Sequence, residues 1–357
     1  EENMRKKRFW IDGLCAACCV VIAAAVIGCA LPGKKAEAGP AQEGDDSYSK
    51  EEVRTLAETA DETTVWSAYW DCADTLRVLR SEKEYIQAVS LFEAYFKDDE
   101  IVIPEATEKT LNQIRNRETM RDMTVFLSFV NDVDQNGTIV QKDTDILKKH
   151  IGSEAVARAH AEHLVEIASE GGYDGVEIDY EKIRSDMELW DDFLRFEDFL
   201  LEAASEKNLK VRIVLEPSTP VEDLTFPEGA EYVVMCYNLY GGGTEPGPKA
   251  DRDFLKELKE RFGMLSDISY AFADGGFDWE GDSQKAKQLR ASEAAEMAER
   301  YEAKPVRDVA SGALHFEYTK SGTKHTVWYA DEETLKLWAE WLKEEGADPL
   351  HVSLWRL

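Results

Sequence analysis

Short segments rich in β-branched and aromatic residues alternate along the chain with longer segments of helical periodicity. The short segments predict eight β-strands, at residues 64–70, 90–96, 124–130, 173–183, 211–215, 232–237, 268–272 and 351–355. The longer segments predict helices at residues 104–114, 154–170, 186–207, 251–262, 286–301 and 331–345. Eight strands with helices between them favour an α/β fold of the (β/α)8 (TIM) barrel type over a doubly wound sheet.

The last part of the chain departs from a regular alternation. Residues 314–318 and 325–329, joined by a Lys-Ser-Gly-Thr turn at 320–323, predict a β-hairpin inserted after strand seven. The sequence ends at Leu357, directly after the eighth strand. The eighth helix is therefore predicted to be missing.

The fourth predicted strand, residues 173–183, carries an unusual row of acidic side chains. Its apolar and acidic positions alternate as Val176, Glu177, Ile178, Asp179, Tyr180 and Glu181. Three carboxylates on one face of a covered strand would cost several kcal/mol each if they only filled space. A functional site is the favoured interpretation, and a solvated acidic strand is the less favoured one.

A divalent-metal site is a second, less favoured interpretation of these acids. Metal-binding loops place their ligands on a turn, whereas a spacing of two residues along a strand projects them in a row. We therefore expect no metal and no cofactor.

The acidic segment resembles a family signature. Asp174-Gly175-x-Glu177-x-Asp179-x-Glu181 is similar to the pattern Asp-x-x-Asp-x-Asp-x-Glu of glycoside hydrolase family 18, the chitinases and endo-β-N-acetylglucosaminidases. In that family the pattern lies on the fourth strand of a (β/α)8 barrel. The sequence departs from it once, with Glu177 in place of Asp. The resemblance implies that Glu181 is the general acid and base, that Asp179 orients the substrate's acetamide group, and that Glu177 lies deeper and shares a proton with Asp179.

A second segment resembles the same family. Met235-Cys-Tyr-Asn238, at the end of the sixth strand, is similar to the family's Met-x-Tyr-Asp or Met-x-Tyr-Asn. The resemblance implies that Tyr237 donates to the acetamide carbonyl and that Trp355, ending the eighth strand, lies under the sugar. Without the resemblance, a packing role would explain Tyr237 and Trp355 at the ends of strands as well as a catalytic role does. The remaining candidates for substrate binding are Met235, Asn238, Tyr69 and Trp70.

The resemblance implies a retaining glycosidase that uses its substrate as the nucleophile. Glu181 and Asp179 lie on one strand and cannot flank a bond, so the sugar's own acetamide oxygen would form an oxazolinium intermediate. The sugar must then carry an N-acetyl group, and the expected partner is an N-acetylglucosamine-containing glycan: chitin, peptidoglycan or an N-glycan. A non-catalytic chitinase-like carbohydrate-binding lipoprotein is the alternative, and the presence of Glu181 favours the enzyme.

The N-terminal residues predict export. A basic segment, Met4–Arg8, precedes an apolar run that ends in Val26-Ile-Gly-Cys29, which resembles a bacterial lipobox with Cys29 as the lipidated residue. An uncleaved membrane anchor is the alternative. We therefore expect a signal peptide at 1–29, a flexible linker at 30–60, a catalytic domain at 61–357, and an extracytoplasmic, membrane-anchored lipoprotein on a bacterial cell surface.

Charge and cysteine content narrow the possible partners. The formal net charge of −30 argues against nucleic acid and against adhesion to anionic lipid, so membrane contact is expected only through the lipid anchor. Beyond the leader only Cys72 and Cys236 remain, which excludes a disulfide scaffold and a zinc site. Nothing in the sequence suggests more than a monomer.

Overall fold

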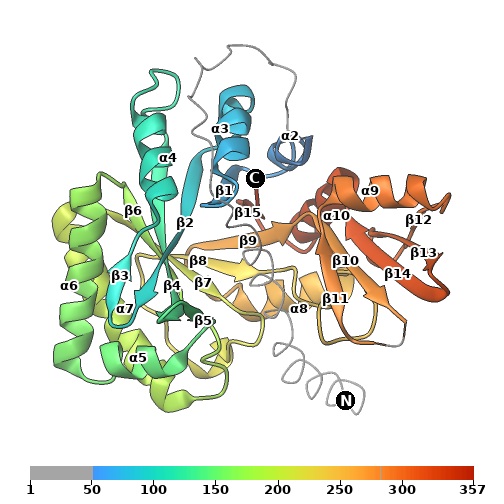
Figure 1. The fold of residues 1–357 in the computed structure, drawn as a ribbon. Coiled ribbons are helices and arrows are strands. Elements are labelled where there is room, and N and C mark those ends of the chain that lie inside the picture. The colour runs from blue at the N-terminus through green and yellow to red at the C-terminus, as the bar shows by residue number, and fades with distance from the viewer. Residues whose placement is uncertain (1–50, 282) are drawn as a thin grey trace.

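The computed structural model describes residues 51–281 and 283–357, and a closed ring of eight parallel strands lies at its centre (Figure 1). Each strand pairs in parallel with the next one in the ring, and the last pairs with the first. The ring consists of β1 (Glu62–Ala68), β2 (Ala88–Lys97), β4 (Thr124–Gln135), β6 (Gly175–Asp179), β7 (Lys210–Leu215), β8 (Glu231–Met235), β9 (Ile268–Ala273) and β15 (His351–Trp355). The predicted (β/α)8 barrel is confirmed.

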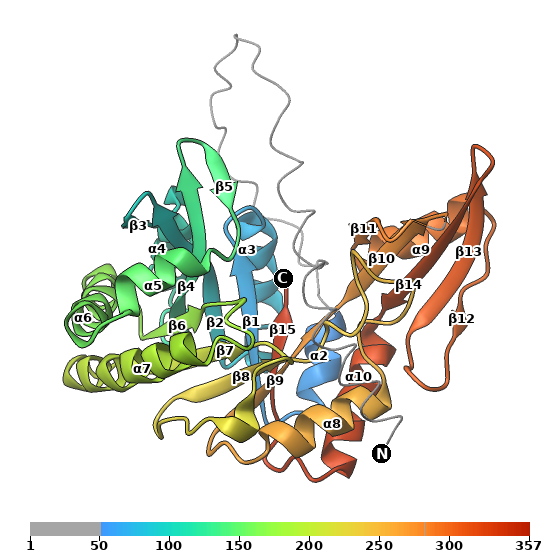
Figure 2. The ribbon, with the colours of Figure 1, turned by 90° about the horizontal axis from the view of Figure 1, so that it is seen from below.

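Helices cover the outside of the ring (Figures 1 and 2). They are α3 (Cys72–Ser81), α4 (Glu105–Arg115), α5 (Thr144–Ile151), α6 (Glu154–Gly171), α7 (Met187–Lys207), α8 (Arg252–Phe262) and α10 (Glu332–Glu344), with short 3-10 turns at η2 (Lys83–Tyr85) and η3 (Val221–Asp223). Local sequence signals set several of their ends. Asp186 caps α7 by accepting from the backbone N–H of Leu189, and Gly172 ends α6 with a φ of 82°.

A helix that the sequence did not predict, α2 (Glu51–Ala57), precedes the first strand. It lies within residues 30–60, where a flexible linker was expected, but Val53 and Leu56 are fully buried. The helix packs against α10, and Asp61, directly before β1, donates its backbone N–H to the Leu350 carbonyl ahead of β15. Because α2 adjoins both α10 and the β15–β1 seam, it covers the side of the barrel where an eighth helix would pack.

Two short antiparallel pairs extend the mouth of the ring. β3 (Glu100–Val102) folds back on β2, and β5 (Thr138–Val140) folds back on β4. Both pairs lie beyond the carboxyl ends of the ring strands, and the β4–β5 pair projects from the barrel in Figure 2.

The insertion after the seventh strand is larger than the predicted hairpin. The hairpin itself is present as β13 (Leu314–Lys320) and β14 (Thr323–Ala330), but it belongs to a five-stranded antiparallel sheet beside the barrel (Figure 2). The other strands are β10 (Gly275–Glu280), β11 (Ala286–Leu289) and β12 (Val306–Arg307), and α9 (Ala291–Arg300) packs on the sheet.

The helix predicted at 286–301 is therefore wrong in its first turn. Residues Ala286–Leu289 pair antiparallel with β10, where Ala286 and Leu289 are buried, and the helix begins only at Ala291. The apolar spacing of this segment fits a strand end as well as a helix start, and the pairing with β10 decides between them.

Apolar side chains pack on both sides of the ring of strands. The main core fills the space between the ring and its helices. A smaller cluster, which we call the inner cluster, fills the carboxyl end of the barrel interior and consists of Trp66, Val214, Val233, Met235 and Ala271, with Phe92, Tyr237 and Trp355 packed against it.

The predicted signal peptide at 1–29, including the candidate lipidation residue Cys29, lies outside the described residues. Within the part that the structure describes, every helix is too short or too polar to span a bilayer.

Candidate active site

The acidic segment lies where the fourth ring strand reaches the mouth of the barrel. Strand β6 ends at Asp179, four residues earlier than predicted, so Glu177 and Asp179 lie on the strand and Glu181 follows it. Beyond Glu181 the chain turns, because Lys182 takes a left-handed backbone with a φ of 64° that an extended strand does not adopt. Asn131 of β4 then fixes Glu181 on both sides, accepting from its N–H and donating to its C=O, each at 3.0 Å.

Glu177 points into the barrel and is completely buried. Its carboxylate accepts hydrogen bonds from Trp66 Nε1 at 2.6 Å, Ser90 Oγ at 2.7 Å and Arg212 Nε at 2.9 Å. The sequence analysis did not foresee this pairing of Glu177 with the Arg212 guanidinium. The proton sharing between Glu177 and Asp179 stays a prediction.

Asp179 has the opposite surroundings. Its Oδ1 atom is buried and has no hydrogen-bond partner among the described residues. Burial raises the pKa of this carboxyl well above its usual range, and the neighbouring Glu181 carboxylate raises it further. A buried acceptor without a partner is costly in a folded protein, so it is a candidate for contact with a ligand.

Glu181 is nearly buried, with a side chain 10% exposed, and forms an ion pair with Lys142 Nζ from the turn after β5. Glu216, which follows β7, is a further carboxyl at the same place: it accepts from the backbone N–H of Lys182 at 2.7 Å. Burial raises the pKa of Glu216, and so does the charge of Glu181. The sequence analysis missed Lys142 and Glu216.

Glu216 could have been predicted from its position in the sequence, whereas Lys142 could not. Glu216 directly follows a ring strand, which is where the functional groups of such barrels collect. Lys142 reaches Glu181 across 39 residues of sequence, through a hairpin that no local pattern aligns with the fourth strand.

Two more carboxyls missed by the sequence analysis lie on the β2 and β4 side of the mouth. Burial raises the pKa of Glu93 to about 8, and the charge of Asp132 adds to this effect. Burial also raises the pKa of Asp132, although its Oδ1 accepts from the Lys142 N–H at 2.8 Å. The mouth is therefore rich in carboxyls that retain protons more readily than usual.

The predicted aromatic residues Tyr69, Trp70 and Trp355 form a continuous row of rings with Phe92, which the sequence analysis did not name. Trp355 meets Phe92 edge-to-face with centroids 4.9 Å apart, Phe92 meets Trp70 at 6.1 Å, and Trp70 meets Tyr69 at 4.8 Å. Trp355 belongs to the packing around the inner cluster, whereas Tyr69 and Trp70 are 36% and 38% exposed. The row runs from the barrel interior to its surface, and its rings offer apolar faces of the kind that pack on pyranose rings.

The three candidates from the sixth strand adjoin the same inner cluster. Met235 is buried in it, and Tyr237 packs against it together with Trp355. Asn238 is partly buried, with its Nδ2 3.4 Å from the sulfur of Met235. Cys236 is buried among the outer apolar residues, as the alternation predicts.

Other residues of the motif have structural roles. Asp174 accepts from Arg115 at 2.6 Å and from the Val125 N–H at 2.8 Å, which ties β6 to β4. Among residues 51–281 and 283–357, no cluster of three or more His, Cys, Asp or Glu side chains has a geometry that would hold a metal ion.

Comparisons with known proteins find similarity in structure and none in sequence. No protein-family model and no curated protein sequence matches the chain. A chitinase from Chromobacterium violaceum superposes with a TM-score of 0.68 at 20% identity, over 84% of this chain and 94% of that one. The spore cortex-lytic enzyme SleL of Bacillus cereus gives a TM-score of 0.64 at 18% identity, over 83% of this chain and 70% of that one.

The chain has the fold of the glycoside hydrolase family 18 chitinases. A third similar structure is the family 18 chitinase of Cycas revoluta in complex with (GlcNAc)3, with a TM-score of 0.63 at 16% identity, over 83% of this chain and 94% of that one. The resemblance inferred from the motif is confirmed at the level of the fold, and the motif lies on the fourth ring strand, as in that family.

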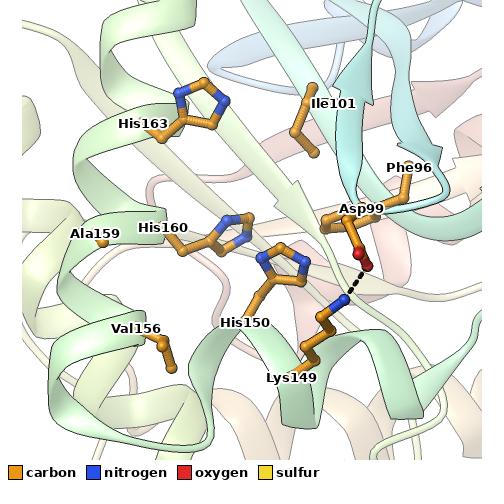
Figure 3. Close-up of a pocket in the computed structure, with 9 residues that line it drawn as sticks. All are labelled: Phe96, Asp99, Ile101, Lys149, His150, Val156, Ala159, His160 and His163. Atoms are coloured by element: carbon orange, nitrogen blue, oxygen red, sulfur yellow. Dashed lines mark ion pairs between the residues drawn. The ribbon is translucent and has the colours of Figure 1, made fainter.

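This family 18 fold also has a pocket of about 370 Å³ on the helix side of the ring, between the β2–β3 hairpin and helices α5 and α6 (Figure 3). His150, His160 and His163 line it. His160 Nε2 lies 2.7 Å from the hydroxyl of Tyr180, the residue between Asp179 and Glu181. Burial lowers the pKa of His160 to about 3, so its ring is neutral and holds Tyr180 from behind the strand.

Proposed function

We propose that the protein is a retaining glycoside hydrolase that cleaves the β-glycosidic bond of an N-acetylglucosamine-containing glycan by substrate-assisted catalysis. The arrangement of Asp179 and Glu181 carries the proposal. Both emerge at the mouth from one strand end, and Asp179 offers a buried acceptor with no hydrogen-bond partner among the described residues. The similarity to family 18 structures supports the proposal through the fold.

In the proposed mechanism, Asp179 accepts a hydrogen bond from the acetamide N–H of the sugar at the cleaved bond. This contact turns the acetamide oxygen toward the anomeric carbon, and the Tyr237 hydroxyl donates to the same oxygen. The oxygen attacks that carbon while Glu181 protonates the departing glycosidic oxygen, which yields an oxazolinium intermediate.

The second half of the reaction returns the acid to its first state. Glu181, now a carboxylate, takes a proton from water, and the water oxygen adds to the anomeric carbon from the side the leaving group left. The bond between that carbon and the acetamide oxygen breaks at the same time, which restores the acetamide group. Two inversions retain the β configuration. Burial and the neighbouring Glu181 carboxylate raise the pKa of Asp179, so Asp179 retains a proton more readily than an ordinary carboxyl beside the group that must supply one to the departing oxygen.

The deciding experiment compares Glu181→Gln with the wild type on chitin oligomers, peptidoglycan and a high-mannose glycopeptide, with products identified by mass spectrometry. We expect kcat to fall at least 100-fold on the glycan that the wild type cleaves, while binding of that glycan persists. The matched control is Glu188→Gln, which removes an exposed carboxylate seven residues further along the chain. Equal turnover by both variants would refute the assignment of Glu181.

Binding without cleavage by the wild type would favour the alternative function. A chitinase-like carbohydrate-binding protein predicts that wild type and Glu181→Gln bind glycans equally and that neither releases products. Proton NMR of the first products tests the stereochemistry, because retention gives the β-anomer before mutarotation.

We further propose that Cys29 carries the lipid anchor and that the protein acts as a monomer on the outer face of a bacterial membrane. The support is the motif at Val26–Cys29 and the net charge of −30, which disfavours other attachment to anionic membranes. Metabolic labelling with a palmitate analogue, compared between wild type and Cys29→Ser, tests the anchor.

A further inference from the structure

Two loops at the mouth of the barrel hold each other through a reciprocal pair of lysine contacts. Lys142, after β5, forms an ion pair with Glu181, and Lys182, after β6, donates from Nζ to the Gln141 carbonyl at 3.1 Å. Carboxylates also hold the two lysine backbones: Asp132 accepts from Lys142 N at 2.8 Å and Glu216 accepts from Lys182 N at 2.7 Å. The backbone that carries Lys142 is therefore held on several sides, and its ammonium group contacts Glu181.

The backbone at Lys142 is in a conformation that a lysine adopts at a cost. Its φ is 54°, in the left-handed region that Gly and Asn adopt more readily. Such a conformation costs about 1 kcal/mol or more and collects at functional sites. Neither the turn nor the strand pairing requires a lysine at this position, whereas its side chain forms the ion pair with Glu181.

The charged groups around this ammonium group are mostly acidic. Those that act on the carboxyl cluster are Asp132, Lys142, Glu177, Asp179, Glu181, Lys182, Arg184 and Glu216. Burial and the Glu181 charge raise the pKa values of Asp179 and Glu216, and Lys142 is the cation that opposes this rise at both. Its side chain is only 22% exposed, so solvent screens the interaction weakly.

We propose that Lys142 is a positioning residue for Glu181: its ammonium group holds the Glu181 carboxylate at the mouth and favours the ionised forms of the neighbouring Asp179 and Glu216 carboxyls. The effect of Lys142 on catalysis rests on the proposed function. Its effect on the ionisation of Asp179 and Glu216 concerns the protein without substrate and does not depend on that function.

The test compares wild type, Lys142→Gln, Lys142→Arg and the control Lys148→Gln, whose lysine forms an exposed pair with Asp186 outside the cluster. Carbon-13 NMR of labelled Asp and Glu carboxyls, assigned with Asp179→Asn and Glu216→Gln, follows the cluster without substrate. In Lys142→Gln we expect the titrations of Asp179 and Glu216 to move up by about one pH unit, and the alkaline limb of the kcat/KM profile to move with them. Lys142→Arg keeps the charge and should stay near the wild type.

Titrations in Lys142→Gln that superimpose on those of Lys148→Gln would overturn the inference. So would a Lys142→Arg variant that behaves like Lys142→Gln, because that result would tie the effect to shape and not to charge. If Lys142→Gln does not fold, Lys142→Met removes the same charge and takes its place in the titrations and the pH–rate profile. If the wild type cleaves none of the glycans, the proposed function fails while the NMR titrations still decide the role of Lys142.

Discussion

Arg212 Nε lies 2.9 Å from the Glu177 carboxylate, and both side chains are closed off from solvent inside the barrel. The same guanidinium contacts both oxygens of Glu231 at 2.9 Å and the Ser353 hydroxyl at 2.9 Å. Both carboxylate oxygens of Glu177 accept hydrogen bonds beneath the site, one from Trp66 and Ser90 and the other from Arg212. Asp179 above it keeps a buried Oδ1 with no hydrogen-bond partner among the described residues, as the proposed contact with the substrate's acetamide requires.

We predict that Arg212→Met destabilises the protein by about 3–5 kcal/mol, because it leaves the Glu177 carboxylate buried without its cation. Urea unfolding followed by circular dichroism measures the change. The matched control is Arg158→Met, which breaks an exposed pair with Glu202 and should cost less than about 1 kcal/mol. Equal costs for the two variants would mean that the Glu177 carboxylate does not depend on Arg212.

The arrangement around Glu177 marks a limit of prediction from the sequence. The ring strands and the order of the barrel could be predicted because alternation and helical periodicity are local signals. The placement of Asp179, Glu181 and the aromatic row at one end of the barrel followed from strand direction. The pairing of Glu177 with Arg212 could not be predicted, because it depends on the register between two neighbouring strands.

The same limit applies to the insertion and to the mouth. The strand at Ala286–Leu289 depends on a partner, β10, that forms only when the whole insertion folds. The contact of Lys142 with Glu181 depends on how far the β4–β5 hairpin projects over the ring. Long-range geometry decided both.

A buried carboxyl away from the site predicts how stability changes with pH. Glu197 of α7 is fully buried, and burial raises its pKa from 4.5 to about 8. Its Oε1 is hydrogen-bonded to the Tyr232 hydroxyl, and its Oε2 has no partner among the described residues. The protonated form suits this place, because a neutral carboxyl loses less on burial than a carboxylate.

The folded protein therefore holds a proton on Glu197 that the unfolded chain releases above about pH 4.5. The stability gained from Glu197 is complete below that pH and is lost as the pH rises through about 8. We predict that wild-type stability falls by a few kcal/mol between pH 5 and pH 9, and that Glu197→Gln flattens the fall. Urea midpoints at pH 5, 7 and 9 measure it.

Glu93 serves as the comparison for this prediction, because burial raises its pKa to about 8 as well. Glu93→Gln should remove a share of the same pH dependence, and the double variant should remove more than either single one. An exposed replacement, Glu188→Gln, should leave the curve unchanged. A Glu197→Gln curve parallel to that of the wild type would show that Glu197 is ionised in the folded state.

The row of aromatic rings predicts how affinity depends on glycan length. Trp70 is 38% exposed at the outer end of the row, whereas Trp355 packs against the inner cluster near the acids. We predict that Trp70→Ala raises KM about 5- to 10-fold for long oligomers and leaves kcat nearly unchanged, because one lost stacking contact is worth about 1 kcal/mol and is made equally in the ground and transition states. Trp70→Phe, which keeps a ring, should recover most of the affinity. Steady-state kinetics on oligomers of increasing length measures the effect, and an equal rise in KM for the shortest and longest oligomers would place Trp70 beside the cleaved bond instead of at a distant sugar.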